Sequence, residues 1–475
     1  MHGVTILAGP SDWEILQQEK GYAQITLKGT YKVHSAALEV GVQSAMPVIR
    51  VIKEEDNMAV IPWSAANKVT KKEYFTGEFE TTLIIPSGGL YRIETGLETR
   101  SVQSDLSWMF RGDCVLHVGV GNLFIIAGQS NSAGYSRDYC MDPPDVSVHL
   151  FRNRDQWDLA SHPMNESTDA GSIANEEMGI PGVSPYLSFG KCYAAYTHMP
   201  VGLIQTALGG SSIRRWRPNE GDLYQNMLGK IHKTKGRYAG ILWYQGCSDT
   251  DPESAPFYYE HFKDFVQSVR EELGYKIHFF TMQLNRQING SYDRGWGLVR
   301  EAQKRAAREI EGVTTLSTTN LNLSDEIHNS AQANVVLGEK LAKQCSNVLN
   351  GTEEYESPTL KNVEFTDMEE KKVLGIRGIW LKLSFAHVKT CFLLYSRRGN
   401  ESGFTLEDEE GEIEIKSIRA NREDRNHIYL ELGRMVNGEA YLSFAWKADP
   451  VRFPVVDEVT YLPPLSFYKN KITIS

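Results

Sequence analysis

The sequence predicts an α/β fold: an α/β/α three-layer domain with a parallel sheet, flanked by N-terminal and C-terminal β-sandwich-like modules. In the middle of the chain, continuous apolar runs alternate with segments of helical period, whereas short runs of alternating apolar residues fill both ends. The length of 475 residues is also too great for one ordinary core. We therefore expect three domains, over residues 1–120, 121–352 and 353–475.

The first segment reads as strands. Its apolar and β-branched residues alternate with polar ones between breaks at Gly, Pro and Asn. Short strands at this spacing are typical of a β-sandwich. The runs are YAQITLKGTYKV (22–33), MPVIRVIKE (46–54), GEFETTLIIP (77–86) and GGLYRIETG (88–96).

The middle segment reads as strand followed by helix. Its continuous apolar runs suit a parallel sheet covered on both faces, and between them apolar residues recur at steps of three and four, which predicts helices over 258–273, 299–310 and 337–348. Reactive groups in such a domain lie at the carboxyl ends of the strands. The runs are NLFIIAG (122–128), VGLIQTA (201–207), YAGILWY (238–244), IHFFTMQL (277–284) and VTTLSTT (313–319).

The last segment returns to short alternating runs and predicts a second β-rich module. The runs are IWLKLSF (379–385), TCFLLYS (390–396), EIEIKSI (412–418), HIYLELG (427–433) and EAYLSFAW (439–446).

Composition excludes several classes of function. A hydrophobic content of 41% with 23% charged residues is that of a globular protein. A net charge of −10 argues against nucleic acid or an anionic membrane as partner, and no apolar run approaches the roughly 20 residues of a membrane span. The start, MHGVTILAGPSDWE, has no basic n-region and no long apolar stretch. We expect a cytoplasmic protein, or a secreted one if a leader has been removed.

Cysteine and histidine positions predict neither disulfides nor a metal site. The six cysteines lie far apart without a CxxC pair, so free thiols are expected. No cluster of His, Asp and Glu has metal-ligand spacing, and we expect no metal and no cofactor. His117 and His149 fit partly buried positions in strands.

Ser130 is the candidate nucleophile. It stands in IIAGQSNSAG (125–134), directly after the first predicted strand of the middle segment, where a serine would be presented near a helix N-terminus. A serine that only caps the next helix fits this stretch equally well.

Asp325 and His328 are the candidate orienting acid and general base. A three-residue step lets the Asp carboxylate reach Nδ1 of the His, which leaves Nε2 to accept the serine proton. Asp424 and His427 have the same spacing, but they fall in a predicted hairpin of the last segment. Position in the α/β pattern therefore selects Asp325 and His328.

Two glycine-containing turns could bind an oxyanion. IQTALGGSSIRRW (204–216) and ILWYQGCSD (241–249) each follow an apolar run. A glycine N–H, the side-chain amide of Gln245 and the Ser130 N–H could together stabilise a tetrahedral intermediate, although each turn alone is more often only a turn. An α/β-hydrolase would instead carry G-x-S-x-G, and no serine here satisfies that motif.

These motifs together resemble the SGNH hydrolases, and most closely the branch of sialate O-acetylesterases and carbohydrate-esterase family 6 acetylxylan esterases. The matching stretches are GQSN (128–131), GGSSIRRW (209–216), WYQGCSD (243–249), VREAQ (299–303) and DEIH (325–328). The resemblance implies Ser130 as nucleophile, His328 as general base and then acid, and Asp325 as its orienter. It also implies an oxyanion hole made by Ser130 N–H, Gly210 N–H and the Gln245 side chain. The residues expected to bind substrate are Gln129, Asn131, Trp216 and Arg300.

Cys247 departs from the family, which usually has Glu in W-Y-Q-G-E-S-D. A thiol in an apolar setting neither holds a charge nor accepts strong hydrogen bonds, which puts the substrate range in doubt. Cys247 could itself be proposed as nucleophile, but the only suitably placed histidine, His328, is better explained by Ser130.

The expected function is a serine esterase that removes O-acetyl groups from acetylated carbohydrates, either plant polysaccharide oligosaccharides or sialic acids, through an acetyl-serine intermediate. One alternative is a non-catalytic carbohydrate-binding protein on the same scaffold, and another is a short-chain lipase or thioesterase. Trp216, Trp243 and Trp296 could form a sugar platform, but packing in the core is at least as good an explanation. The sequence leaves the oligomeric state open.

Overall fold

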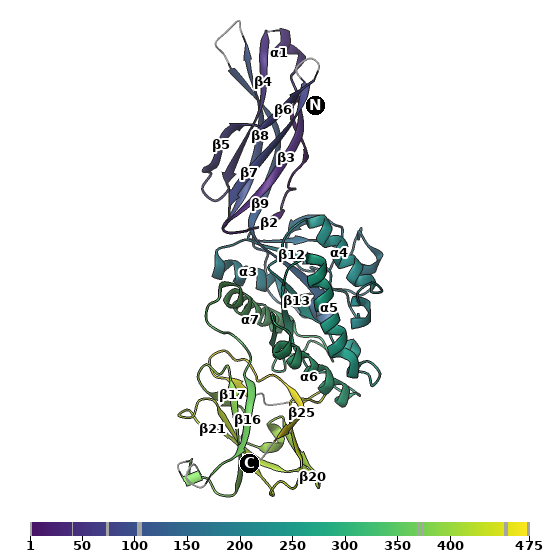
Figure 1. Cartoon of the computed structure of the whole chain (residues 1–475), viewed down its shortest axis with the longest axis vertical. Helices are drawn as coiled ribbons and strands as arrows, with labels where there is room; N and C mark the ends of the chain where they lie inside the picture. Colours follow the sequence, from purple (N-terminus) through teal and green to yellow (C-terminus); the bar gives the residue numbers. More distant parts are fainter. Residues whose placement is uncertain are drawn as a thin grey trace.

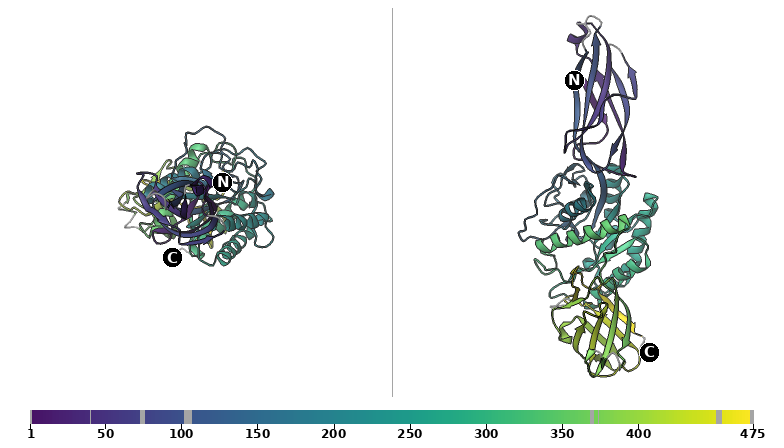
Figure 2. Two further views of the ribbon diagram at one scale, coloured as in Figure 1. Left: turned by 90° about the horizontal axis from the view of Figure 1, so that it is seen from above. Right: turned by 90° about the vertical axis from the view of Figure 1, so that its left-hand side faces the viewer.

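In the computed structural model, the described residues are 2–39, 41–72, 76–101, 107–367, 371–372, 374–450 and 455–472. They form three parts in line along the long axis, with the N-terminal β module at one end and the C-terminal β module at the other (Figures 1 and 2). The predicted α/β fold with β-rich modules on both sides is confirmed.

The N-terminal module packs two sheets around one core that includes Leu27, Val51, Ile85 and Ile93. Its elements are β1 (Gly3–Ala8), β2 (Ile15–Gln17), β3 (Tyr22–Lys32), α1 (Ser35–Glu39), β4 (Val42–Lys53), β5 (Ala59–Ala65), β6 (Lys68–Lys71), β7 (Thr76–Pro86) and β8 (Gly89–Ser101). One sheet has the order β1-β3-β7-β6, and in the other β4 pairs with β5 and β8. Their pattern of alternately buried residues follows from the period-two sequence.

The strand β9 (Ser107–Gly128) belongs to both the N-terminal module and the central domain. Its 22 residues pair first with β8 and β2, and its last part pairs with two strands of the central sheet. The predicted domain boundary at residue 120 therefore falls inside a strand. Gly121 permits this crossing, because a Cβ there would lie 1.8 Å from the backbone oxygen of Pro200.

The central sheet is parallel apart from one edge strand. It consists of β10 (Val148–Phe151), β11 (Trp157–Leu159), β12 (Val201–Gln205), β13 (Gly240–Tyr244), β14 (His278–Met282) and β15 (Val313–Leu316) in the order β11-β10-β12-β9-β13-β14-β15. Only β11 is antiparallel to its neighbour among these pairs. The five predicted apolar runs form β9, β12, β13, β14 and β15, whereas β10 and β11 were not predicted.

Helices cover both faces of this sheet. One core contains side chains of α4 (Asp222–Thr234), α5 (Tyr258–Leu273) and α6 (Asp293–Glu309), and the other contains those of α3 (Tyr186–Thr197) and α7 (Ala331–Asn350). Alternate residues of β9 serve the two cores, since Ile125 lies in the first and Ile126 in the second. This is the three-layer arrangement that the sequence predicts. The short helical turns are α2 (Ser130–Ala133), η1 (Ile173–Asn175), η2 (Ile213–Trp216), η3 (Cys247–Asp249) and η4 (Ala255–Phe257).

The C-terminal module has a core of its own. Its elements are β16 (Thr359–Phe365), β17 (Ile379–Ala386), β18 (Phe392–Leu394), η5 (Gly399–Glu401), β19 (Phe404–Asp408), β20 (Gly411–Ile413), β21 (Ile415–Ala420), β22 (His427–Leu432), β23 (Ala440–Phe444), β24 (Val455–Asp457) and β25 (Phe467–Ile472). They form sheets of order β16-β17-β22-β21 and β20-β19-β23-β25, and a pair β18-β24.

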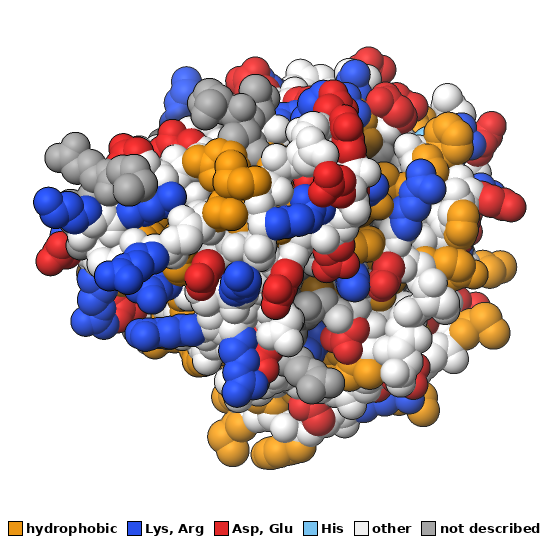
Figure 3. All heavy atoms as spheres, turned by 90° about the horizontal axis from the view of Figure 1, so that it is seen from below, with side chains coloured by type: hydrophobic (Ala, Val, Ile, Leu, Met, Phe, Trp, Pro, Cys, Tyr) orange, Lys and Arg blue, Asp and Glu red, His pale blue; other side chains and the backbone are white. Residues whose placement is uncertain are grey.

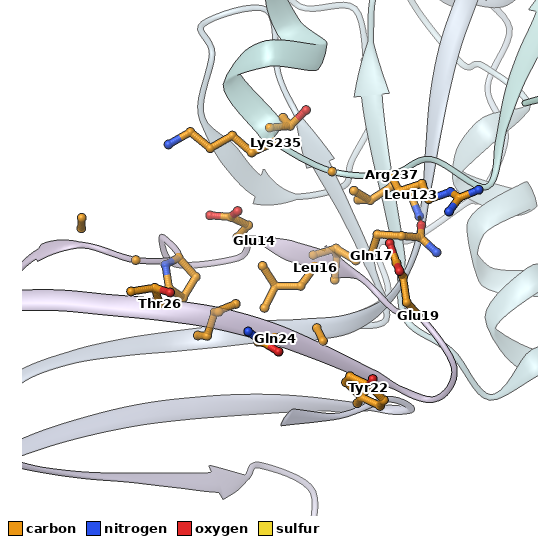
Figure 4. A pocket seen from close by; sticks show the side chains of 18 residues that line it. Glu14, Leu16, Gln17, Glu19, Tyr22, Gln24, Thr26, Leu123, Lys235 and Arg237 are labelled. Carbon is orange, nitrogen blue, oxygen red and sulfur yellow. Dashed lines mark hydrogen bonds between the residues drawn. The ribbon is translucent and has the colours of Figure 1, made fainter. Parts of the chain in front are cut away.

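A cavity of about 560 Å³ lies between the N-terminal module and the central domain, with Glu14, Leu16, Gln17, Lys235 and Arg237 in its walls (Figure 4). It lies at the amino-terminal edge of the central sheet.

The molecular face seen from below carries intermixed acidic and basic side chains (Figure 3). Among the described residues, no helix combines the length and apolar character needed to cross a bilayer.

Candidate active site

Ser130 lies where the central strand of the sheet ends. It follows β9 directly and is the first residue of α2. After β9 the chain builds β10 and β12 on one side of this strand and then crosses to β13 on the other, so Ser130 stands at the topological switch point of the sheet. Its side chain is largely enclosed, with an exposed fraction of 6%.

Asp325 and His328 form the hydrogen-bonded pair that their spacing predicts. Asp325 Oδ2 lies 2.7 Å from His328 Nδ1, and Oδ1 accepts the backbone N–H groups of His328 at 2.7 Å and Ile327 at 2.9 Å. Burial opposes ionisation of Asp325, but these hydrogen bonds and the nearby imidazole outweigh it and lower the pKa of the carboxyl group. An ionised Asp325 fixes the proton on Nδ1 and leaves Nε2 to accept another.

Asn131 joins the serine turn to this pair. Its Oδ1 accepts the N–H of Asn329 at 2.9 Å, and its Nδ2 donates to the backbone oxygen of Ile327 at 3.2 Å. The residues on either side of His328 are thus held by the neighbour of Ser130. No hydrogen bond joins Ser130 Oγ to the imidazole itself. The two loops that carry Ser130 and His328 are connected through the hydrogen bonds of Asn131.

Two backbone N–H groups are free to receive a negative oxygen. Within the described part of the chain, neither Ser130 N–H nor Gly210 N–H donates to a protein acceptor. Gly210 has a φ of 65°, and a Cβ at this position would meet nothing within 4 Å. The turn therefore faces open space with its N–H unpaired.

Gln245, the third predicted member of the oxyanion hole, is fully buried. Its Nε2 has three acceptors, namely Asp249 Oδ2 at 2.5 Å, the backbone oxygen of Ser211 at 3.1 Å and Gln129 Oε1 at 3.4 Å. A contact with an oxyanion would have to replace one of these. Its place in the oxyanion hole stays a prediction.

The comparisons with known proteins support a carbohydrate esterase. Residues 120–347 match the family model described as carbohydrate esterase, sialic acid-specific acetylesterase. The match spans the central domain, and the prediction of a carbohydrate O-acetylesterase is confirmed.

The esterase also resembles solved structures. A carbohydrate acetylesterase from Xanthomonas citri has a TM-score of 0.59 and 17% identity, and the match covers 96% of this chain and 97% of that one, so the fold extends over all three parts. A protein from Arabidopsis thaliana has 24% identity and a TM-score of 0.42, over 47% of this chain and 97% of that one. A family two carbohydrate esterase from Cellvibrio japonicus has 15% identity and a TM-score of 0.31, over 70% and 90%. A comparison with curated protein sequences gives no significant match.

Two of the four predicted substrate-binding residues are wrong, because both are fully buried. Trp216 packs edge-on against Trp243 in the core under η2. Arg300 donates to backbone oxygens of the central domain and of the C-terminal module. Residue type suggested contact with a sugar, but neither side chain reaches the surface. Trp243 and Trp296 are buried as well, so the alternative of core packing holds for all three tryptophans.

Gln129 and Asn131 lie at the site of the esterase, but their polar atoms are used within the protein. Gln129 Oε1 accepts the N–H groups of Gly246 at 2.9 Å and Ser248 at 3.2 Å. These bonds hold the turn after β13 against the turn after β9. Both side chains therefore support the site rather than line its opening.

Cys247 is unsuited to act as a nucleophile. Burial raises the pKa of its thiol to about 12, so no thiolate forms near neutral pH. The described residues contain no group of three or more His, Cys, Asp or Glu side chains arranged to hold a metal ion. The second Asp-x-x-His sequence also forms a hydrogen-bonded pair, between Asp424 and His427, but at the start of β22 in the C-terminal module.

Sequence reasoning missed two residues at this site, Tyr135 and Glu177. The Tyr135 ring lies against the His328 ring, with centroids 5.1 Å apart, and its hydroxyl donates to Glu177. Glu177 comes from the loop after η1, 42 residues away in sequence. No local motif marks either residue.

Proposed function

We propose that the esterase removes O-acetyl groups from acetylated carbohydrates through an acetyl intermediate on Ser130. The observation that carries this proposal is the tie from Asn131 to the backbone on both sides of His328, which holds a hydrogen-bonded Asp–His pair beside the turn of Ser130.

In the first half of the reaction, Ser130 Oγ attacks the acetyl carbonyl carbon while His328 Nε2 takes the hydroxyl proton. The negative charge on the carbonyl oxygen is met by the Ser130 and Gly210 N–H groups. When the tetrahedral intermediate collapses, the bond from carbon to the sugar oxygen breaks, and that oxygen takes the proton from His328.

In the second half, water attacks the acetyl group on Ser130, and His328 accepts its proton. The bond from carbon to Ser130 Oγ then breaks, Oγ regains a proton from His328, and acetate leaves. Asp325 stays ionised throughout and stabilises the imidazolium formed in each half.

We predict that Ser130→Ala and His328→Ala fold normally and lose at least about a thousandfold in kcat. His427→Ala is the matched control, because His427 pairs with Asp424 at the same three-residue spacing, and the activity of this variant should stay within about twofold of wild type. The activity of each variant is measured as acetate release from an acetylated xylo-oligosaccharide and from O-acetylated sialic acid. Full activity of His328→Ala with loss in His427→Ala would move the site to the other module.

The acyl and sugar specificity is tested on the same preparation. A carbohydrate deacetylase should hydrolyse p-nitrophenyl acetate much faster than the octanoate ester, whereas a lipase or thioesterase should prefer the longer chain. Mass spectrometry after a pulse of acetyl donor should show one acetyl group on wild type and none on Ser130→Ala. Labelling of Ser130→Ala would exclude Ser130 as the nucleophile.

A further inference from the structure

Glu177 lies between the two halves of the catalytic apparatus. Its Oε2 accepts the N–H of Gly209 at 2.8 Å, and Gly209 precedes Gly210, whose N–H is proposed to bind the oxyanion. Its Oε1 accepts the hydroxyl of Tyr135 at 2.5 Å, and the Tyr135 ring packs on His328. We propose that Glu177 is a positioning residue that fixes the oxyanion turn and the general base relative to each other. This inference rests on the proposed function.

The backbone is shaped to admit this contact. A Cβ on Gly209 would lie 2.3 Å from Tyr135 Oη, and one on Gly179 would lie 2.2 Å from the same oxygen. The hydroxyl is therefore enclosed between two glycines that come from different loops. A side chain on either glycine would push Tyr135 away from Glu177 and from His328.

Glu177 is also bound by a buried network of three asparagine side chains, Asn165, Asn153 and Asn175. Asn165 Nδ2 donates to Glu177 Oε2 at 2.8 Å, and Asn153 Nδ2 donates to Asn165 Oδ1 at 2.8 Å. Asn153 Oδ1 in turn accepts from Asn175 at 2.8 Å and from the buried Nζ of Lys230 at 3.0 Å. Each link is satisfied, so the carboxylate has a fixed position.

The surroundings of Glu177 require a carboxylate. The groups within hydrogen-bond distance are donors on both oxygens, since the N–H of Gly179 also reaches Oε1 at 3.2 Å. Burial and the neighbouring carboxylate raise the pKa of Tyr135, so its hydroxyl stays protonated and donates. A glutamine at this position would replace one carboxylate oxygen by an NH₂ group. That NH₂ group would face the donors that now bind the oxygen, and their hydrogen bonds would be lost.

Glu177→Gln therefore tests the proposal. We expect kcat for p-nitrophenyl acetate to fall at least about tenfold with KM within twofold, since small displacements of catalytic groups cost mainly transition-state stabilisation. The inhibition constant of methylboronic acid, which forms a tetrahedral adduct on the nucleophilic serine, should rise by a similar factor. Glu176→Gln is the matched control, because Glu176 is exposed in the same loop, and it should behave as wild type.

Tyr135→Phe is the second variant, because it keeps the ring on His328 and removes only the hydroxyl. We expect a several-fold lower kcat and a melting temperature close to that of wild type. If Glu177→Gln fails to fold, wild-type kcat and boronate inhibition in Tyr135→Phe would overturn the proposal. So would wild-type values in a folded Glu177→Gln. A wild-type enzyme that neither hydrolyses acetyl esters nor binds methylboronic acid would instead refute the proposed function.

Discussion

At the scale of single residues, Asp249 is a buried carboxyl group that binds Gln245 in the candidate active site. It accepts the N–H of Ile213 at 2.9 Å as well as the amide of Gln245. Burial raises its pKa from 3.8 to about 6, because its hydrogen bonds compensate only part of the lost hydration. The folded protein therefore binds more protons than the unfolded chain between about pH 4 and pH 6.

This shift predicts how stability depends on pH. Since the folded-state pKa is the higher one, the contribution of Asp249 to the free energy of unfolding is fully present below about pH 4 and is lost as pH rises through about 6, by roughly 3 kcal/mol at most. Asp249→Asn cannot titrate, so the difference in unfolding free energy between wild type and variant should change over this window and stay constant above pH 7. Urea denaturation at several pH values measures it. Parallel pH profiles for the two proteins would show that Asp249 has an ordinary pKa.

The sequence identifies residues whose partners are near in the chain. Asp325 and His328 are three residues apart, so their spacing alone places them within reach of each other. Trp216 and Arg300 were assigned to the substrate by residue type, which carries no information on burial. Glu177 could not be found in this way, because the partners that connect it to the site, Gly209 and Tyr135, lie 32 and 42 residues away and meet it only in the folded domain.

At the scale of elements, α6 connects the catalytic domain to the C-terminal module through Arg300. This fully buried guanidinium donates to five backbone oxygens, those of Leu284, Asn285, Ala445, Trp446 and Lys447. Burial lowers the pKa of Arg300 to about 10, so it is charged at neutral pH. The carbonyl oxygens take the place of the lost water.

Arg300→Lys should cost roughly 2–6 kcal/mol of unfolding free energy, because the three donors of an ammonium group leave at least two of the five carbonyl oxygens unpaired and each costs about 1–3 kcal/mol. Arg305→Lys on the same helix is the control. Arg305 is exposed and pairs with Glu309, so its loss should cost less than about 1 kcal/mol. Equal denaturation midpoints for the two variants would contradict the role of Arg300.

Long apolar runs and helical periods were sufficient to predict the central strands and the helices α5, α6 and α7. The strand β10 escaped because its four residues, VHLF, are too few to show a period. The full length of β9 was not predicted for a different reason. The glycines that interrupt its apolar pattern allow Pro200 to approach closely, a contact that no local pattern reveals.

At the scale of the whole molecule, the C-terminal module completes the catalytic domain. Gln283 exchanges two hydrogen bonds with the backbone of Ser466, at 2.8 and 3.0 Å, and Gln287 N–H donates to the backbone oxygen of Ala448. The next residue, Ile288, donates to the backbone oxygen of Glu326, which follows Asp325. Removal of the module would take away the hydrogen-bond partners of Gln283 and Gln287.

A chain that ends at residue 357 should therefore be unfolded or aggregated and lack esterase activity, as judged by circular dichroism, size-exclusion chromatography and acetate release. Coexpression of residues 358–475 as a separate polypeptide should restore part of the soluble, active protein. A soluble truncated chain with wild-type kcat would show that the module is dispensable.

The shared strand β9 has a consequence for folding of the chain during its synthesis on the ribosome. The N-terminal module can close as soon as the residues up to Val120 have emerged, but the rest of β9, up to Gly128, then extends from a finished domain as a bare apolar strand. Its two neighbours, β12 and β13, are synthesised only later, beginning at Val201 and Gly240. During that interval the nascent chain exposes the central strand of an unbuilt sheet, which is an edge prone to wrong pairing. The first module thus acts as a fixed template on which the catalytic sheet must assemble outward in both directions.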